Sequence, residues 1–315
     1  LIIFLIIMAL KVNSQHILST NLVPNPSFEE YKYCPFSCSQ IDFAVPWNST
    51  RIVTGSSDYL NNCTTFYWLL AFLQKISPRT GDGCAGIIVM NNPFNMTGVY
   101  REYIATKLTK QLINKKKYCV NFFVIPFTSV YVIEDIGMFF SINQINSENP
   151  FFFALTLIDS VPQIKNNNGL INDTLNWTKI SGVYEAKGAE EYITIGNFNN
   201  DINTNYWISP NSNPLTAYYM IDDVSVCECS FDINLGADTM LCEGETIILN
   251  PNLPNATYTW QDSSHAATYE VKQPGTYWVR AYVAEYDVYS SDTIVITQGD
   301  DSFCNPPLTI PNVIT

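Results

Sequence analysis

The chain has 315 residues, of which 47% are hydrophobic and only 14% are charged, and its formal net charge is −13. The hydrophobic content argues for a folded chain, and the length allows two domains with real cores. The acidic balance argues against nucleic acid and anionic membranes as partners, because both bind clusters of Lys and Arg. With so few charges, Asn, Ser, Thr and Tyr must cover much of the surface, as is common in secreted β-proteins.

The N-terminal run Leu1–Leu10 is apolar, too short to span a bilayer, and of the length of a signal-peptide core. Small residues follow at Val12–Ser14, so we expect residues 1–14 to be a signal peptide that is cleaved before Gln15. No initiator Met or basic segment precedes the run, so we expect the sequence to begin inside this signal. A buried strand or helix start is the alternative. The mature protein is therefore expected to be exported, without a membrane span.

Nine cysteines fit an oxidising compartment, and the odd number leaves at least one outside an intramolecular bridge. Cys34 and Cys63 would close a loop of about 30 residues, which the chain-entropy estimate values at roughly 3 kcal/mol. Cys38 with Cys84 is a possible second bridge, although spacing alone does not fix connectivity. The CxxxC and CxC spacings do not favour zinc, because both histidines lie far from them.

Short β-branched and aromatic segments separated by turn residues predict strands up to residue 226. The segment Tyr100–Leu112 fits a helix or a strand, and we favour a strand because it would form a hairpin with the next segment. Phe66–Ile76 fits a short helix or a strand. Eight or more short strands are typical of a β-sandwich or jelly roll. The other strands are expected at Asn21–Glu29, Ala85–Met90, Lys117–Ile125, Asp135–Ile142, Phe151–Leu157, Trp177–Ala186, Glu191–Phe198 and Ala217–Val226.

The last of these strands carries two adjacent carboxylates, Asp222 and Asp223. Its alternation places Asp223 on the same side as Tyr219, with Asp222 on the other side. An unpaired buried anion costs several kcal/mol, so a strand with two carboxylates needs a compensating partner. A hard cation such as calcium prefers oxygen ligands and would serve. We therefore expect the first and last strands to lie side by side, with Glu29 near Asp222 or Asp223.

The texture of the sequence changes after Cys227. About 70 residues with a central Trp260, divided by turns that contain Pro, Gly and Asp, are typical of a small immunoglobulin-like sandwich. Its expected disulfide is in doubt, because only Cys229 or Cys304 lies within reach of Cys242 along the chain. Strands are expected near Ile247–Leu249, Tyr258–Trp260, Thr276–Val283 and Thr293–Thr297.

Several segments together resemble the N-terminal domain of large surface proteins of Bacteroidetes. They are Asn21–Tyr31, Asp58–Cys63, Tyr100–Ile104, Asp135–Ser141, Glu191–Phe198 and Ala217–Cys229. The next segments resemble the immunoglobulin-like or PKD-like repeat of the same proteins, and they are Leu235–Leu249, Tyr258–Ser264 and Gly275–Arg280. The tail, Leu308–Thr315, is similar to the opening of the gliding-motility-associated C-terminal sorting domain of type IX secretion cargo.

The resemblance implies residues 15–228 as a carbohydrate-binding-module-like jelly roll and 229–299 as the immunoglobulin/PKD-like domain. Residues 300–315 would be a linker into a truncated sorting domain, through which the outer-membrane secretion machinery would be a partner. In jelly-roll carbohydrate-binding modules with similar end motifs, a glutamate and an aspartate bind a structural calcium. Carried over, these are Glu29 with Asp222 or Asp223. The alternative is that the two aspartates cap a strand end or pair with Lys or Arg.

Carbohydrate binding needs flat aromatic faces for sugar rings and polar side chains at their edges. Aromatic residues in or beside the predicted loops, among many Asn, supply these groups, although each could instead belong to the core. Asp58 and Asn61 could instead shape their loop. The candidate ligand-binding residues are Asp58, Tyr59, Asn61, Tyr100, Tyr206 and Trp207.

No sequence signature of catalysis is present: the chain has no HExxH, no GxSxG and no phosphate-binding glycine loop. The pairs Glu134–Asp135 and Glu190–Glu191 offer two carboxylates each, as glycoside hydrolysis requires, but any acidic chain contains such pairs. We therefore expect no enzyme.

Together these observations predict an all-β protein, a jelly-roll β-sandwich followed by a small immunoglobulin-like β-sandwich. Its expected function is non-catalytic binding at the cell surface or outside the cell, to an extracellular glycan or a surface protein. A structural adhesin that binds protein partners is one alternative. A polysaccharide-degrading enzyme is the less favoured one.

Overall fold

The computed structural model describes residues 20–49, 57–92, 100–145, 160–212, 214–229, 233–284, 288–300 and 304. The regular secondary structure of the described chain is almost all strand, as predicted. The chain divides into two compact units, the first at Ser19–Cys229 and the second after it. The predicted signal peptide, the strand expected at Phe151–Leu157 and the tail Leu308–Thr315 lie outside the described residues.

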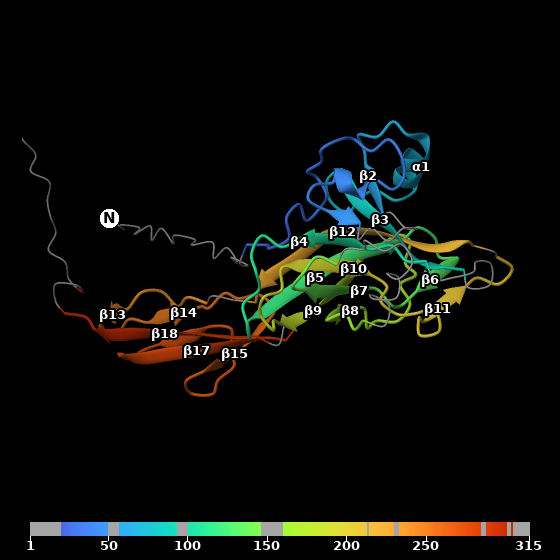
Figure 1. The fold of residues 1–315 in the computed structure, drawn as a ribbon. Coiled ribbons are helices and arrows are strands. Elements are labelled where there is room, and N and C mark those ends of the chain that lie inside the picture. Colours follow the sequence, from blue (N-terminus) through green and yellow to red (C-terminus); the bar gives the residue numbers. More distant parts are fainter. Residues whose placement is uncertain are drawn as a thin grey trace, which may run out of the picture. The chain divides into compact units, whose positions relative to one another are not determined.

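Two five-stranded sheets form the first unit (Figure 1). Every pair of neighbouring strands in them is antiparallel. The first sheet contains, in spatial order, β1 (Asn48–Ser49), β4 (Ile104–Lys107), β10 (Tyr192–Gly196), β7 (Gly137–Ser141) and β8 (Ile164–Lys165). The second sheet contains β2 (Asp58–Asn61), β3 (Gly83–Asn91), β12 (Thr216–Glu228), β5 (Lys117–Pro126) and β9 (Thr178–Glu185).

The main hydrophobic core lies between these two sheets. The first sheet contributes Met138 and Ile193 to this core, and the second contributes Val120 and Ile221. All four side chains are fully buried. The chain passes back and forth between the sheets as it adds strands, which is the pattern of a jelly roll. The predicted β-sandwich is therefore confirmed.

The N-terminal segment lies beside β12 but is not the regular strand that we predicted. The backbone N–H of Leu22 donates to the carbonyl of Val226 at 2.8 Å, and that of Val224 donates to the carbonyl of Pro26 at 2.9 Å. Pro24 and Pro26 have no N–H to give to a ladder, and Phe28 has φ +60°, so strand geometry is interrupted. The predicted adjacency of the two ends is confirmed.

A β-bulge at Asp222 and Asp223 breaks the strict alternation that we expected in β12. The register against β5 shifts between Asp222 and Ser225, and Asp223 adopts φ +49°. Ile221 and Val224 therefore both face the core, although an ideal strand would put them on opposite sides. The bulge turns the two carboxylates away from the main core.

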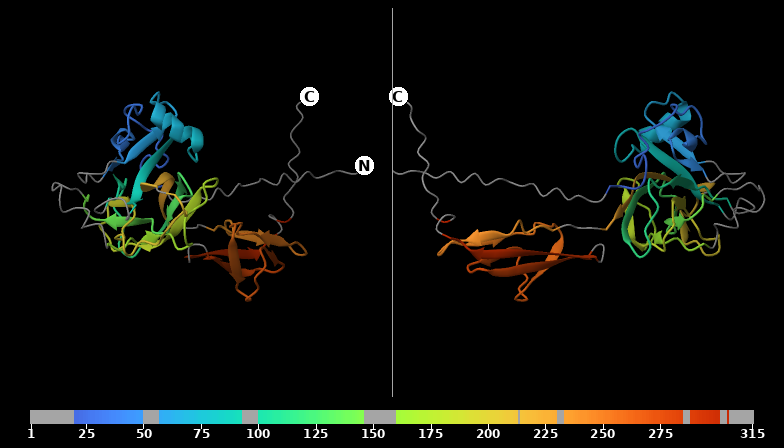
Figure 2. Two further views of the ribbon diagram at one scale, coloured as in Figure 1. Left: turned by 90° about the vertical axis from the view of Figure 1, so that its right-hand side faces the viewer. Right: turned by 60° about the vertical axis from the view of Figure 1, so that its left-hand side comes forward.

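Helix α1 (Tyr67–Lys75) covers part of the outer face of the second sheet (Figures 1 and 2, cyan). The segment contains no β-branched residue, and Leu69 and Leu73 recur at a spacing of four, so one face of the helix is apolar. That face packs on Met220 and Tyr218 of β12. The structure thus confirms the helix that we considered for Phe66–Ile76. Within the described residues, none of the helices has the length and hydrophobicity that a membrane span requires.

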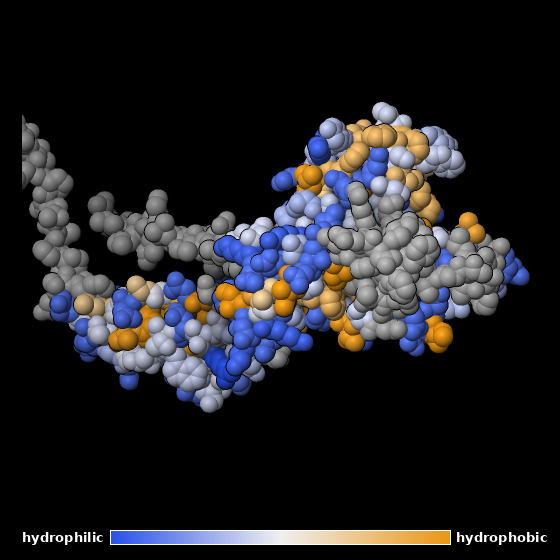
Figure 3. All heavy atoms as spheres, viewed as in Figure 1, coloured by the Kyte–Doolittle hydropathy of each residue, from blue (hydrophilic) through white to orange (hydrophobic). Residues whose placement is uncertain are grey.

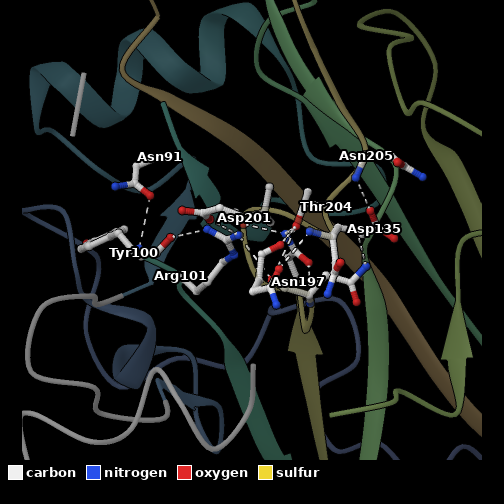
Figure 4. Close-up of polar contacts among 12 residues, drawn as sticks. Asn91, Tyr100, Arg101, Asp135, Asn197, Asp201, Thr204 and Asn205 are labelled. Carbon is white, nitrogen blue, oxygen red and sulfur yellow. Dashed lines mark hydrogen bonds and ion pairs between the residues drawn. The ribbon is translucent and has the colours of Figure 1, made fainter. Parts of the chain in front are cut away.

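A small two-stranded sheet, β6 (Tyr131–Ile133) with β11 (Tyr206–Ile208), adjoins a buried polar network that Figure 4 shows. Arg101, whose side chain has no exposed area, donates to the carboxylate of Asp201 at 2.6 Å and to the carbonyl of Asn199 at 3.3 Å. The short 3-10 helix η1 (Ile41–Phe43) precedes β1 and contributes Ile41 to the main core.

The second unit is a smaller β-sandwich around Trp260, which is fully buried. All four strands predicted for this part of the chain are found at nearly the expected positions, and two further strands, at Thr239–Leu241 and Tyr269–Val271, were not predicted. One sheet contains β13 (Thr239–Leu241), β18 (Val288–Gln298), β17 (Gly275–Val283) and β15 (Ala256–Trp260), and the other contains β14 (Ile247–Leu249) and β16 (Tyr269–Val271).

Three disulfides connect described cysteines: Cys34 with Cys63, Cys119 with Cys229, and Cys242 with Cys304. The bridge that we considered between Cys38 and Cys84 is absent from the described chain. Cys84 is fully buried in the cluster under helix α1, whereas Cys38 is exposed on a loop. Of the two partners considered for Cys242, the structure selects Cys304.

Candidate functional site

A pocket of ≈ 460 Å³ opens on the face of the second sheet that carries helix α1. It brings together residues from β2, β12, α1 and the segment that leads into β4. Two of the six predicted ligand-binding residues, Asp58 and Tyr100, are among its lining residues. The lining residues on which its chemistry depends are Asp58, Phe72, Tyr100, Glu102, Phe127 and Tyr218.

The floor of the pocket is a tyrosine that crosses a neighbouring strand to reach a carboxylate. Tyr218 of β12 donates its hydroxyl to Asp58 of β2 at 2.7 Å, over the intervening strand β3. At the crossing point β3 has Gly86, where a Cβ would lie 1.8 Å from the Tyr218 hydroxyl oxygen. Only glycine therefore lets the tyrosine lie across the strand.

Asp58 is held by a second hydrogen bond, from the backbone N–H of Ser39 at 2.6 Å. Its side chain is largely buried, and this burial raises the pKa of its carboxyl group. Burial and the nearby Asp58 likewise raise the pKa of the Tyr218 phenol. Tyr218 therefore stays a neutral hydrogen-bond donor.

A second buried carboxylate, Glu102, lines the same pocket and is also paired with a tyrosine. Its Oε1 accepts the hydroxyl of Tyr100 at 2.9 Å, and its Oε2 accepts the backbone N–H of Ile88 at 2.7 Å. Tyr100 is itself placed by its backbone N–H, which donates to Asn91 at 3.2 Å (Figure 4). The pocket thus offers two Tyr–carboxylate pairs with fixed geometry.

Aromatic rings form the apolar side of the pocket. Phe72 of α1 stacks on Phe127 with ring centroids 4.4 Å apart, and Tyr218 packs edge-on to Phe72 at 5.2 Å. Apolar residues are also visible at the surface around helix α1 in Figure 3. In the first turn of helix α1, the side chains of Tyr67 and Trp68 are exposed, at 73% and 62% of their accessible areas. Ring faces beside carboxylates and hydroxyls are the groups that bind sugar rings.

Tyr59 and Asn61, which we predicted to bind ligand, have structural positions instead. Tyr59 has no exposed area, and its hydroxyl donates to the carbonyl of Phe28 at 2.9 Å. Asn61 is 2% exposed and donates to that same hydroxyl at 2.8 Å. In β2 the alternation of side chains directs Asp58 and Leu60 away from the core and Tyr59 into it. Neither ring nor amide is open to a ligand here.

Tyr206 and Trp207 lie on β11, outside the lining of this pocket. Tyr206 packs edge-on to the buried Tyr131 at 5.9 Å. Trp207 is 44% exposed and keeps part of its ring open to solvent. That Tyr206 and Trp207 bind a ligand stays a prediction, and any such ligand would bind outside this pocket.

The carboxylate pairs that we considered for hydrolysis are engaged in local structure. Glu134 and Asp135 accept the side-chain and backbone N–H groups of Asn205, at 3.2 and 2.7 Å. Asp135 also lines a second pocket, of ≈ 290 Å³. Glu190 accepts the hydroxyl of Tyr184, and the neighbouring Glu191 pairs with the exposed Lys107 at 2.8 Å.

The three acidic residues that we predicted as calcium ligands all contact one turn, residues 79–83. Glu29 accepts backbone N–H groups of Asp82 and Gly83, at 3.0 and 2.9 Å. Asp222 accepts the backbone N–H groups of Arg79 and Thr80, at 2.8 and 3.2 Å. Asp223 forms an ion pair with Arg79 and accepts the hydroxyls of Thr80 and Ser27.

Each of these carboxylates therefore faces N–H or O–H donors, which a cation would have to displace. Among the described residues, no three Asp, Glu, His or Cys side chains are grouped as metal ligands. The arrangement matches the alternative reading, in which the aspartates cap local structure and pair with Arg79. Calcium at Glu29, Asp222 and Asp223 is thus implied by the sequence resemblance alone, and the donors that face Glu29 and Asp222 lead us to expect no effect of calcium on the stability of the fold.

Sequence reasoning missed four of the six residues on which the chemistry of the pocket depends: Phe72, Glu102, Phe127 and Tyr218. Phe72 lies within the apolar segment Phe66–Ile76, Phe127 lies just after the predicted strand Lys117–Ile125, and Tyr218 was one residue of an alternating strand. The one available signal was Gly86, a glycine inside a predicted strand, because such a glycine often marks a close approach by another group. The identity of that group could not be read from the sequence.

No protein-family model and no curated protein sequence matches the chain. Among solved structures, it is similar to a carbohydrate-binding module in complex with β-1,4-galactotriose, with 12% identity, a TM-score of 0.32, and coverage of 67% of this chain and 99% of the module. It is also similar to the K1 cleaved adhesin domain of Lys-gingipain from Porphyromonas gingivalis W83, with 15% identity, a TM-score of 0.31, and coverage of 64% and 94%.

A third similar structure is the N-terminal cellulose-binding domain of Cellulomonas fimi β-1,4-glucanase C. Its identity is 10% and its TM-score 0.28, and the match covers 64% of this chain and 100% of that domain. Because all three TM-scores are low, we infer no function from these similarities. The case for a function therefore rests on the pocket itself.

Proposed function

We propose that the first unit is a non-catalytic binding domain that holds a glycan in the pocket between helix α1 and strand β12. The observation that carries the proposal is the combination, in one pocket of ≈ 460 Å³, of aromatic side chains with two carboxylates already held by tyrosines. Rings bind the apolar faces of sugars, and fixed carboxylates accept their hydroxyl groups.

The positions of the polar groups support binding by a preorganised site. Asp58 and Glu102 each accept one tyrosine hydroxyl and one backbone N–H, so their orientations are set before a ligand arrives. A ligand hydroxyl then meets an acceptor that needs little reordering, which reduces the entropic cost of binding.

The three disulfides support a location in an oxidising compartment, at the cell surface or outside the cell. In this proposal the second unit is a spacer, and adhesion to glycan-bearing surfaces is the biological role. Export by a type IX-like route remains part of the same proposal and is supported only by the sequence resemblance.

Phe127→Ala tests the site, because it removes an aromatic wall and leaves both carboxylates in place. The whole chain, wild type and variant, is applied to a glycan array, and the affinity for each hit is measured by calorimetry. We expect the variant to bind at least tenfold more weakly, as the loss of one stacking ring predicts.

Trp207→Ala is the matched control, because it removes an exposed aromatic residue outside this pocket. It should leave the affinity unchanged, while unfolding curves show that both variants are folded. Loss of binding in Trp207→Ala, with Phe127→Ala unaffected, would move the site to β11. Absence of any glycan hit would favour the rival, an adhesin for protein partners, and release of reducing sugar from a bound polysaccharide would favour an enzyme.

A further inference from the structure

Three cysteines meet at one end of the second sheet of the first unit. Cys119 lies on β5, Cys227 lies near the end of the neighbouring strand β12, and Cys229 follows that strand directly. Tyr118 and Val226 belong to the main core, so the alternation of side chains puts all three cysteines on the opposite face. Cys119 and Cys229 form the disulfide, and Cys227 is left as a buried free thiol.

The register of the two strands brings Cys227, and not Cys229, directly opposite Cys119. Opposed residues of antiparallel strands have Cα atoms about 4.5–5.5 Å apart, and disulfides join Cα atoms that are about 4.4–6.8 Å apart. Cys229 lies opposite Lys117, to whose carbonyl its backbone N–H donates at 3.0 Å, and its Cα is 5.0 Å from that of Cys119. Cys119 therefore has two cysteines at disulfide distance and is bonded to one of them.

The thiol of Cys227 is placed to compete for this bridge from within the same chain. Thiol–disulfide exchange begins when a thiolate attacks one sulfur of a disulfide, and an attacking group that is already held nearby avoids the entropic cost of an encounter. The Cys227 sulfur lies 3.3 Å from the hydroxyl oxygen of Ser225, which can donate a hydrogen bond to the thiolate. Because Cys227 is only 5% exposed, thiols of other molecules have little access to it.

We propose that these three residues form an exchange centre, in which the disulfide moves between Cys119–Cys229 and Cys119–Cys227. The thiolate of Cys227 attacks the sulfur of Cys119, and the bond from Cys119 to Cys229 breaks. Its electron pair leaves on the sulfur of Cys229, which takes up the proton that Cys227 has lost. One S–S bond forms as another breaks, so the exchange needs no oxidant or reductant.

The exchange changes where the first unit is fastened and which thiol is free. Cys229 is the last residue of the first unit, so the observed bridge fastens the chain at the boundary between the units. The alternative bridge closes nearly the same length of chain, and therefore keeps the stabilisation that comes from loop closure. It releases Cys229, the less buried of the two competing cysteines, as a thiol that can bond to another molecule.

Labelling of the individual cysteines in the whole chain tests whether exchange occurs. Folded protein is incubated at about pH 8.5, where an ordinary thiol is about half ionised. It is then denatured in acid, which stops exchange, and its free thiols are alkylated. Cleavage after Glu228 separates Cys227 from Cys229 for mass spectrometry. We expect label on both cysteines of the wild type, and about tenfold less label on Cys229 in Cys227→Ser, where nothing competes for the bridge.

Cys229→Ser tests whether the alternative bridge can form. The nine cysteines of the wild type form three disulfides and leave three free thiols. If Cys227 takes the place of Cys229, the oxidised variant has two free thiols, and peptide mapping finds Cys119 joined to Cys227. If it does not, the variant has four. Cys227→Ser, which keeps the observed bridge, is the matched control and should have two.

Two results would overturn the exchange centre. One is label on Cys229 that is no greater in the wild type than in Cys227→Ser, and the other is four free thiols in a folded Cys229→Ser. If Cys229→Ser does not fold, the labelling of the wild type and of Cys227→Ser decides the question alone. Either result leaves the proposed glycan binding untouched, because none of these three cysteines lines the pocket.

Discussion

The carboxylate of Asp222 accepts a hydrogen bond of 2.8 Å from the backbone N–H of Arg79, 143 residues earlier in the chain. Asp223, its neighbour, pairs with the side chain of the same arginine. Glu29 binds the other end of the same turn, through the N–H groups of Asp82 and Gly83. One turn thereby joins the beginning and the end of the first unit.

This geometry predicts how stability depends on pH. Burial, followed by the charge of Asp223, raises the pKa of the Asp222 carboxyl to about 7 from the ordinary value of 3.8. Between these two values the folded state holds a proton that the unfolded state has released, so the contribution of Asp222 to stability falls as pH rises from about 4 to about 7. Each pKa unit corresponds to about 1.4 kcal/mol, so the loss is a few kcal/mol.

Asp222→Asn should remove this part of the pH dependence, because an amide does not titrate. Urea unfolding at several pH values between 4 and 8 measures it. We expect the free energy of unfolding of the variant to change less with pH than that of the wild type. Asp173→Asn, a change at an exposed aspartate, is the control and should follow the wild type. Parallel curves for Asp222→Asn and wild type would show that Asp222 is ionised throughout.

Calcium gives a second prediction for the same turn. Because the oxygens of Glu29 and Asp222 face backbone N–H donors, we expect the unfolding midpoint to be the same in calcium and in a chelator. Differential scanning fluorimetry measures both conditions. A midpoint that rises with calcium concentration, and no longer rises in Glu29→Gln, would establish the calcium site that the sequence resemblance implies.

The ion pair of Arg101 with Asp201 predicts a large effect from a single carboxylate. The side chain of Arg101 is completely buried, so Asp201→Ala leaves a buried guanidinium without its counter-ion. We expect a loss of about 3 kcal/mol, since breaking a buried pair strands the remaining charge. Urea unfolding is the measurement.

Glu270→Ala removes the partner of Lys272 in an exposed pair and provides the contrast. Its effect should stay below about 1 kcal/mol, as is usual for exposed ion pairs. Equal effects of the two substitutions would mean that water reaches the Arg101 guanidinium after Asp201 is removed.

The disulfide between Cys119 and Cys229 closes the longest loop of the three, with a separation of 110 residues. Replacing both cysteines with Ala should lower the free energy of unfolding by about 5 kcal/mol on the chain-entropy estimate. Denaturant unfolding under non-reducing conditions measures the loss. Cys38→Ser alters a free, exposed cysteine and should have little effect. A loss of similar size in Cys38→Ser would mean that Cys38 is itself bridged.

Gly86→Ala should disable the pocket with little damage to the fold. The added methyl group would meet the Tyr218 hydroxyl oxygen at 1.8 Å, so the ring has to move and its bond to Asp58 breaks. We expect glycan binding to fall at least tenfold, as the loss of a fixed carboxylate predicts. Gly275→Ala, in a strand of the second unit, is the control, because the added group would lie 3.5 Å from the nearest atom, of Tyr277, and it should leave the glycan affinity unchanged. Unaltered glycan affinity in Gly86→Ala would exclude Tyr218 from the site.

The sequence by itself determined the class of fold and the nearness of its two ends. Short β-branched segments between turn residues predict strands, as at Lys117–Ile125. Such a pattern lies within about ten consecutive residues, so it can be recognised without knowing the tertiary structure. It also singled out Asp58 and Tyr100, because polar and aromatic residues beside turns commonly bind ligands.

Only the tertiary structure decided what surrounds those two residues. Tyr218 donates a hydrogen bond to Asp58, which lies 160 residues earlier in the chain. This contact requires a residue without a side chain, Gly86, in the strand between them. Likewise, a bulge at Asp223 reversed the side-chain alternation expected along β12. Contacts between strands depend on register and on the space that neighbouring side chains leave, and neither is encoded in any single local segment.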